Sequence, residues 1–218
     1  MGKTSIEETR IALVTGANKG LGKEISRQLS AKGHLVVMGA RDRQRGEEVA
    51  AELRVQGLPV EFIPLDVTSQ ASVDDAAAEV ERRFGRLDIL VNNAGVRLDW
   101  SAGSELTVET LRETLETNVF GVFRVTKAVL PLLRKSMHGR IVNLSSGLVS
   151  LTWNADPNSP LPSHRHMSLA YSSSKAALNM TTVQLADELK SARIKVNSAD
   201  PGSTAPDNVA HANQSLPG

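Results

Sequence analysis

Short β-branched runs alternate along the chain with longer amphipathic stretches, and this alternation limits the folds that are open to it. Strand-like runs are expected at 11–15, 35–40, 60–65, 88–92, 140–145 and 194–199. Helix-like patterns lie between them, at about 21–32, 43–57, 69–84, 107–136 and 168–192. Strands and helices in this order form right-handed βαβ units, which bury a parallel sheet between two layers of helices. The predicted fold is a doubly wound α/β domain of the Rossmann type.

Length and composition favour one domain and exclude several classes of partner. A chain of 218 residues is expected to form a single domain over 1–218. The formal charge of +1 gives no basic field for nucleic acid or an anionic membrane. No run approaches the roughly 18 apolar residues of a membrane span, and no apolar run precedes Ile11. Because cysteine is also absent, we expect a cytoplasmic protein without nucleic-acid or membrane partners.

The glycine-rich stretch TGANKGLG, at 15–22, joins the first strand-like run to the first helical pattern. Glycines here allow a tight turn, and they let backbone N–H groups and the helix N-terminus approach a diphosphate. Two similar motifs do not match. A P-loop would require Gly at position 17 and Ser or Thr at position 24, where the chain has Ala17 and Glu24, and a G-x-G-x-x-G pattern that begins at Gly20 would require Gly at position 25, where the chain has Ile25. The stretch is either a structural turn or a cofactor loop, and its place between strand and helix favours the cofactor. The expected contacts are Gly16, Asn18, Lys19, Gly20, Leu21 and Gly22.

The pattern T-G-x-x-x-G-x-G resembles the cofactor loop of the short-chain dehydrogenase/reductase family. Further matches follow in the family's order: LDV with Asp66, NNAG at 92–95, TNVFG with Asn118, NLSS at 143–146 and YSSSK at 171–175. The resemblance covers residues 11–202, and these ordered matches are far more specific together than any one alone. The residues NKG in the glycine loop and the long segment before Tyr171 are most similar to those of the carbonyl-reductase-like branch.

The resemblance implies a catalytic set of Ser146, Tyr171, Lys175 and Asn118. Tyr171 and Lys175 are four residues apart, which places them on one helix face. Reduction of a carbonyl leaves an alkoxide-like oxygen that needs a proton, and we expect the ammonium of Lys175, with oxidised nicotinamide nearby, to lower the pKa of Tyr171. Ser146 would hold and polarise the carbonyl. Asn118 would help to hold a water next to Lys175, although it could instead be a buried amide bridging helix turns.

The choice of cofactor depends on the end of the second strand-like run. An acidic residue there would bind the ribose 2′-OH, but the chain has Ala40 followed by Arg41. A guanidinium suits a 2′-phosphate, and Lys19 adds charge, so the expected cofactor is NADPH. The alternative is a solvated basic turn. Beyond the glycine loop, the resemblance implies cofactor contacts from Arg41, Asp66, Val67, Asn93, Ala94, Gly95, Tyr171, Lys175, Pro201, Gly202 and Thr204.

The end of the chain departs from the family pattern. The tail at 203–218 is short and irregular, with no apolar run that could form the family's last strand. We therefore expect a sheet without that strand, whose sixth strand is an exposed edge. The family's threonine beside the nicotinamide aligns with Pro206, and Thr204 is its possible substitute.

Residues 147–170 break the strand–helix rhythm. Because they contain Pro157, Pro160 and Pro162, we expect an inserted loop without helix or central strand. In the carbonyl-reductase-like branch such a loop lies over the outer faces of the helices at 107–136 and 168–192, which favours a monomer. No metal site is expected, since His164 and His166 lack a third ligand nearby.

The function predicted from these features is the NADPH-dependent reduction of small or medium apolar aldehydes and ketones, with Tyr171 as general acid. Two alternatives stay open. One is an NAD-dependent alcohol dehydrogenase, which would differ in its relative affinity for the two cofactors. The other is a truncated, catalytically weak NADPH-binding sensor or partner protein, which the short tail favours.

Overall fold

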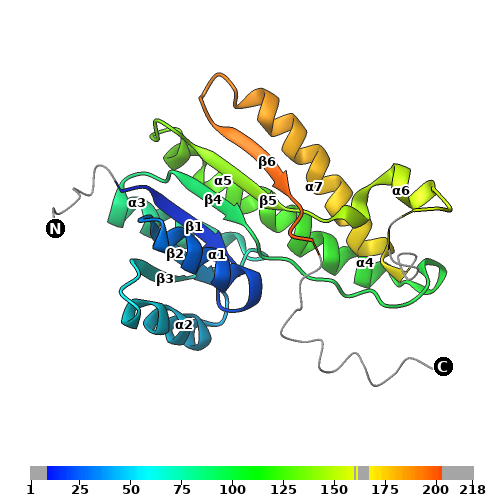
Figure 1. The fold of residues 1–218 in the computed structure, drawn as a ribbon, viewed down its shortest axis with the longest axis horizontal. Helices are drawn as coiled ribbons and strands as arrows, with labels where there is room; N and C mark the ends of the chain where they lie inside the picture. Colours follow the sequence, from blue (N-terminus) through cyan, green and yellow to red (C-terminus); the bar gives the residue numbers. More distant parts are fainter. Residues whose placement is uncertain (1–8, 160, 162–166, 203–218) are drawn as a thin grey trace.

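The computed structural model describes residues 9–159, 161 and 167–202. Its centre is one parallel sheet in the order β3-β2-β1-β4-β5-β6 (Figure 1). The strands are β1 (Ile11–Thr15), β2 (Leu35–Ala40), β3 (Val60–Pro64), β4 (Ile89–Asn92), β5 (Arg140–Leu144) and β6 (Lys195–Ala199). Each begins within one residue of its predicted start. The doubly wound α/β fold predicted from the sequence is confirmed.

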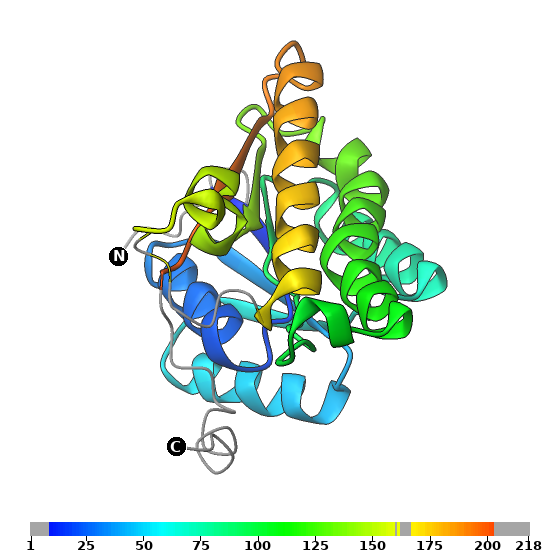
Figure 2. The same cartoon turned by 90° about the vertical axis from the view of Figure 1, so that its right-hand side faces the viewer.

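Helices cover both faces of this sheet. The longer ones are α1 (Gly20–Ala31), α2 (Arg43–Val55), α3 (Gln70–Phe84), α4 (Val108–Leu115), α5 (Val122–Leu133) and α7 (Leu169–Glu188). The short ones are the 3₁₀ turns η1 (Gly103–Glu105) and η3 (Gly147–Val149), the π-helix η2 (Glu116–Gly121) and α6 (Leu151–Ala155). Helices α3, α5 and α7 form one layer, and α1 and α2 form the other (Figure 2).

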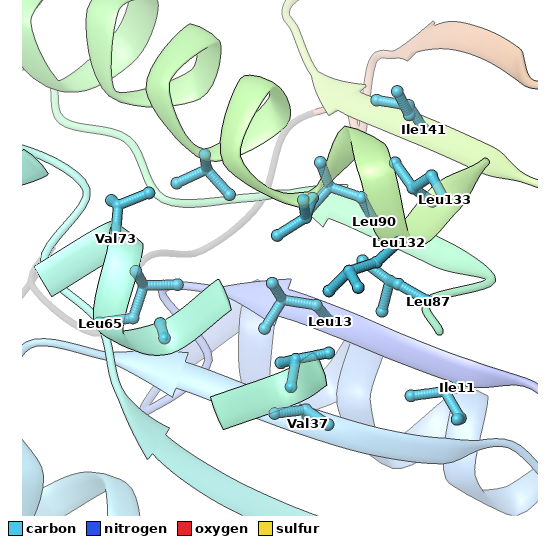
Figure 3. Close-up of a cluster of buried hydrophobic side chains, with 14 of the residues drawn as sticks. Ile11, Leu13, Val37, Leu65, Val73, Leu87, Leu90, Leu132, Leu133 and Ile141 are labelled. Atoms are coloured by element: carbon cyan, nitrogen blue, oxygen red, sulfur yellow. The ribbon is translucent and has the colours of Figure 1, made fainter. Parts of the chain in front are cut away.

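Two apolar clusters follow from the alternation of side chains along β1. Ile11 and Leu13 enter the cluster under α3 and α5, which Figure 3 shows. Ala12 and Val14 enter the cluster under α1 and α2. All four side chains are buried, as a strand covered on both sides requires.

The long helix expected at 107–136 is interrupted, which corrects the sequence analysis. The π-helix η2 separates α4 from α5, and the three follow one another without an intervening residue. Asn118 lies in this wide turn, and its amide forms hydrogen bonds with both backbone groups of Val96. These bonds hold the turn open. They depend on a residue 22 positions away, so the local pattern of apolar residues did not reveal them.

The segment 147–170 also differs from the expected loop. It forms η3 and α6 beside the N-terminal end of α7 (Figures 1 and 2). The hydroxyl of Ser150 caps α6 by accepting from the N–H of Trp153, and Pro157 comes only after the helix has ended. Proline restricts its own position and the residue before it, so a helix ending at Ala155 is compatible with it.

The outer helix faces stay exposed in the part of the chain that the structure describes. Phe120, Phe123, Met180 and Val183 project from η2, α5 and α7 and are 50–62% exposed. The described residues of 147–170 therefore do not cover this surface as expected. The monomeric state stays a prediction. Among the described helices, none is both long and apolar enough to cross a membrane.

Candidate active site

The glycine loop takes a shape that side chains would obstruct. Gly16 has a φ of +65°, and a Cβ there would lie 2.9 Å from the Cα of Ala94. A Cβ on Gly22 would collide with the carbonyl oxygen of Gly16. The N-terminus of α1 thus opens onto a surface of bare backbone, which fits the diphosphate of a dinucleotide.

Thr15 and Asn93 fasten this loop to the end of β4. The hydroxyl of Thr15 accepts from the N–H groups of Asn93 and Ala94, at 3.1 and 2.9 Å. The amide of Asn93 donates to the carbonyls of Thr15 and Gly16, at 2.8 and 3.2 Å. Sequence reasoning did not assign Thr15 a role, although it is the first letter of the T-G-x-x-x-G-x-G pattern.

An open groove of about 630 Å³ runs past the carboxyl ends of β1, β2, β3 and β4, where ligands bind in doubly wound sheets. Most of the predicted cofactor residues line it: Gly16, Asn18, Lys19, Gly20, Leu21, Gly22, Arg41, Asp66, Val67, Asn93, Ala94 and Gly95. The sequence analysis missed Glu24, Ala40, Asp42, Arg45, Leu65, Thr68, Val96 and Thr117 as lining residues. Most of these flank a motif that it did identify, so proximity along the chain was the available signal.

The end of the groove beyond β2 carries positive charge. Arg41 and Arg45 both line it and are exposed. The carboxylate of Asp42 also borders it, but accepts from the N–H of Arg45 and so caps α2. The acid in this basic turn therefore has a structural partner, while Arg41 and Arg45 both line the groove.

Asp66 is ionised at the same end of the groove. Burial alone would raise its pKa, but hydrogen bonds from the N–H and hydroxyl of Thr68 lower it overall, helped by Arg41 and Arg124. Both bonds reach Oδ1, at 2.9 and 2.7 Å. Thr68 thus orients the carboxylate that the resemblance assigns to the adenine.

The structure brings Ser146, Tyr171 and Lys175 together beyond β5. Ser146 lies just after this strand and caps η3, accepting from the N–H of Leu148. Tyr171 and Lys175 lie on the first turns of α7, with the lysine Nζ 5.8 Å from the tyrosine ring centroid. Lys175 is buried and donates to the carbonyl of Leu144 at 2.7 Å. The end of β5 therefore positions both the serine and the lysine.

The pKa of Tyr171 differs from the expectation that Lys175 lowers it. Burial raises this pKa above its ordinary value, while a side-chain hydrogen bond with Ser146 and the charge of Arg97 oppose the increase, and Asp200 adds to it. Burial also lowers the pKa of Lys175 to about 8. Burial disfavours the charged form of each group, the phenolate of Tyr171 and the ammonium of Lys175, and it is the largest cause of both shifts.

Lys175 should therefore make stability depend on pH. Its pKa is about 8 in the folded protein and near 10.5 in the unfolded chain, so the unfolded chain binds more protons between these values. The free energy of unfolding should rise with pH across this window, by about 3 kcal/mol in total. In Lys175→Met this increase should disappear, which urea denaturation at pH 7, 8, 9 and 10 would measure.

Lys190→Met is the matched control, since Lys190 is exposed just beyond α7. The free energy of unfolding of this variant should rise with pH as steeply as that of the unmodified protein. Parallel curves for the unmodified protein and Lys175→Met would show that Lys175 is not buried as a charge.

Asn118 links Val96, which lines the groove, to helix α7. Its Oδ1 accepts from the N–H of Val96 at 2.8 Å, and its Nδ2 donates to the Val96 carbonyl and to Ser174 Oγ at 2.8 and 3.0 Å. The amide is buried, but it bridges distant segments of the chain in place of the helix turns of the alternative, and a role beside a water stays a prediction. A Cβ on Gly95 would lie 3.3 Å from Asn118 Oδ1 and 3.5 Å from Lys175 Nζ. The groove residue Gly95 thus lies next to two of the predicted catalytic residues.

The other predicted site residues either do not line the groove or lie outside the described residues. Pro201 and Gly202 follow β6, are exposed and do not line the groove, so their contact with a cofactor stays a prediction. Thr204, His164 and His166 lie outside the described residues.

The comparisons with known proteins agree with this geometry. The sequence profile of the family described as short chain dehydrogenase matches residues 10–217. The chain belongs to the short-chain dehydrogenase family. Its glycine loop, NNAG turn and Tyr171–Lys175 pair are the parts that the sequence analysis assigned by resemblance to this family. The structure places the loop and the turn along one groove, and Lys175, with Tyr171 beside it, next to the groove residue Gly95.

Relatives of this short-chain dehydrogenase come from plants and bacteria. Short-chain dehydrogenase/reductase 1 of Saponaria officinalis is 42% identical over 163 residues, which cover 65% of this chain and 54% of that protein. The (+)-neomenthol dehydrogenase of Arabidopsis thaliana is 41% identical over 167 residues, covering 66% and 56%. The Pseudomonas aeruginosa RhlG/NADP active-site complex has a TM-score of 0.82 and 33% identity, covering 94% of this chain and 77% of that chain. The chain thus spans little more than half the length of the two plant relatives.

Proposed function

We propose that the protein reduces aldehydes or ketones to alcohols with NADPH. The observation that carries this proposal is the convergence of Ser146, Tyr171 and Lys175 where the groove ends at Gly95. Relatives named as (+)-neomenthol dehydrogenase and (−)-isopiperitenone reductase support a small-molecule oxidoreductase. Within the family, the long segment before Tyr171 supports the carbonyl-reductase-like branch.

Each side chain has a distinct role in this proposal. The hydroxyl of Ser146 donates a hydrogen bond to the substrate carbonyl oxygen and polarises it. The phenol of Tyr171 donates its proton to that oxygen as negative charge develops. Lys175 lies 5.8 Å from the tyrosine ring and stabilises the phenolate that remains. The reduced nicotinamide, when bound, supplies the hydride.

The groove supports NADPH as the cofactor. Ala40 occupies the strand end where an acid would favour NADH, and Arg41 and Arg45 border the same space. A guanidinium can bind a 2′-phosphate through two hydrogen bonds. Similar structures include the NADP complex of a Shigella flexneri dehydrogenase and the NADH complex of a Brucella melitensis reductase.

The NAD-dependent alternative has one observation in its favour. Asp42 borders the groove, and its carboxylate could accept from a ribose hydroxyl. We favour NADPH because Asp42 already caps α2 through the N–H of Arg45 at 3.0 Å. In addition, Arg41 and Arg45 line the same part of the groove as Asp42.

Arg41→Ala should weaken NADPH binding about tenfold to a hundredfold, the scale of a hydrogen bond to a charged group. NADH lacks the 2′-phosphate and should lose far less affinity. Titration of both cofactors, followed by fluorescence or calorimetry, would measure the difference.

Arg43→Ala is the matched control, because Arg43 is exposed in the same turn but does not line the groove. It should leave the ratio of NADPH to NADH affinity unchanged. Equal losses for both cofactors in Arg41→Ala would mean that Arg41 has a structural role and that the preference for NADPH rests elsewhere.

A further inference from the structure

Arg97 is held beside the start of the catalytic helix. Its Nη2 donates to the carbonyl of Met167 at 3.2 Å, and its Nε donates to the carbonyl of Asp99 at 3.4 Å. The guanidinium carbon lies 3.9 Å from the centroid of the Trp100 ring, the distance of a cation–π contact. One face of the Arg97 guanidinium is therefore covered by the Trp100 ring.

This guanidinium has no acidic partner within the described residues, since none of their ion pairs includes Arg97. The nearest acid along the chain, Asp99, forms no ion pair with Arg97, although its charge opposes the effect of burial on the pKa of Arg97. Asp99 is 2% exposed, and its Oδ2 accepts from the N–H groups of Ala170 and Tyr171 at 2.7 and 3.3 Å. Asp99 thus caps α7 and leaves Arg97 as a half-buried cation bonded only to carbonyls.

Arg97 also acts on the reacting end of the site. Its charge opposes the increase in the pKa of Tyr171. Burial lowers the pKa of Arg97 itself, and the charges of Asp99 and Tyr171 oppose that decrease. The cation is therefore within electrostatic reach of the phenol to which a carbonyl substrate would bind. A buried or half-buried charge is stable when a partner of opposite sign compensates it.

We infer that Arg97 is a specificity-determining residue that binds a carboxylate carried by the carbonyl substrate. This inference rests on the proposed function and narrows its substrate class. The planar fork of a guanidinium matches a carboxylate in geometry and charge. Trp100, which is 58% exposed, offers its ring to the apolar part of the same molecule. The substrate class is then an oxo acid or a carboxylated aldehyde, in place of the purely apolar compounds expected from the sequence.

The test compares 4-carboxybenzaldehyde with its neutral methyl ester as substrates, both followed by NADPH oxidation. The unmodified protein should prefer the carboxylate. In Arg97→Met, which keeps the length of the side chain, the ratio of the two kcat/KM values should fall about tenfold to a hundredfold. Arg97→Lys should recover part of the ratio, because it keeps the charge but loses the fork.

Arg134→Met is the control for loss of an exposed arginine just beyond α5, and it should leave this ratio unchanged. A structural role for Arg97 would instead lower Tm and reduce both kcat/KM values by the same factor. An unchanged ratio in Arg97→Met would overturn the inference while leaving the proposed reduction intact.

Binding measurements separate the inference from the proposed function. Titration of 4-(hydroxymethyl)benzoate and its methyl ester into the protein with NADP⁺ present requires no turnover. Tighter binding of the carboxylate that Arg97→Met abolishes would support the inference even if neither aldehyde were reduced. Equal binding of acid and ester by the unmodified protein would overturn it.

Discussion

Tyr171→Phe is expected to lower turnover of a carbonyl substrate at least about a hundredfold, the scale of a lost general acid. The substitution removes the only phenol in the chain and keeps the ring that lies 5.8 Å from Lys175 Nζ. Cofactor binding should change little, because Tyr171 does not line the groove. Steady-state NADPH oxidation over a panel of aldehydes and ketones, with calorimetric titration of NADPH, would measure both effects.

Ser173→Ala is a suitable control, since Ser173 is exposed on the same helix two residues away. Its turnover should match that of the unmodified protein. If Tyr171→Phe retained most of its turnover, the proton would have to come from another group, and the assignment of the catalytic set would be wrong. If the unmodified protein reduced no member of the panel but bound NADPH, the sensor or partner alternative would be favoured.

Gly22→Ala should weaken cofactor binding at least about a hundredfold. The new Cβ would collide with the carbonyl oxygen of Gly16, which is backbone and cannot rotate away. The loop must shift, and the N–H groups that would hold the diphosphate move with it. Losing two hydrogen bonds to a charged group, each worth about 1.5–3 kcal/mol, is enough for this effect. Calorimetric titration of NADPH would measure it.

Gly33→Ala is the matched control, because no atom lies within 4 Å of a Cβ at that position. Gly33 has a φ of +86°, so alanine should cost about 1–2 kcal/mol of stability through backbone strain. Its cofactor affinity should be unchanged. Normal NADPH binding by Gly22→Ala would mean that the loop tolerates a side chain and that its glycines serve the turn alone.

Much of the fold could be predicted from local patterns. The strands are short apolar runs buried on both sides, and β1 and its neighbours therefore stand out from the amphipathic stretches between them. The glycine loop could also be assigned, because the requirement for bare backbone at Gly16 and Gly22 is local to the turn. The order of the motifs then located Tyr171, Lys175 and Ser146.

The remaining features depend on contacts between distant residues. The cap of α7 comes from Asp99, 71 residues before the N–H of Ala170 to which it bonds. The pKa of Tyr171 depends on how deeply the folded chain buries it. Neither can be read from the spacing of a motif. The proline-rich segment misled for a different reason, since proline marks where a helix cannot continue but does not exclude a helix that ends before it.

The π-helix η2 has a consequence for how this chain can change in length. An α-helix turns by about 100° per residue, so removing one residue from Glu116–Gly121 would rotate α4 against α5 by roughly that angle. Either Asn118 would leave Val96, or Val125 and Val129 would leave the core cluster. The connection at 97–106 is mostly irregular and can absorb an insertion in the way that surface loops do. The geometry on both sides thus fixes the number of residues in η2. It also constrains Asn118, which bonds to Val96, and Gly121, where a Cβ would lie 2.9 Å from the side chain of Val67.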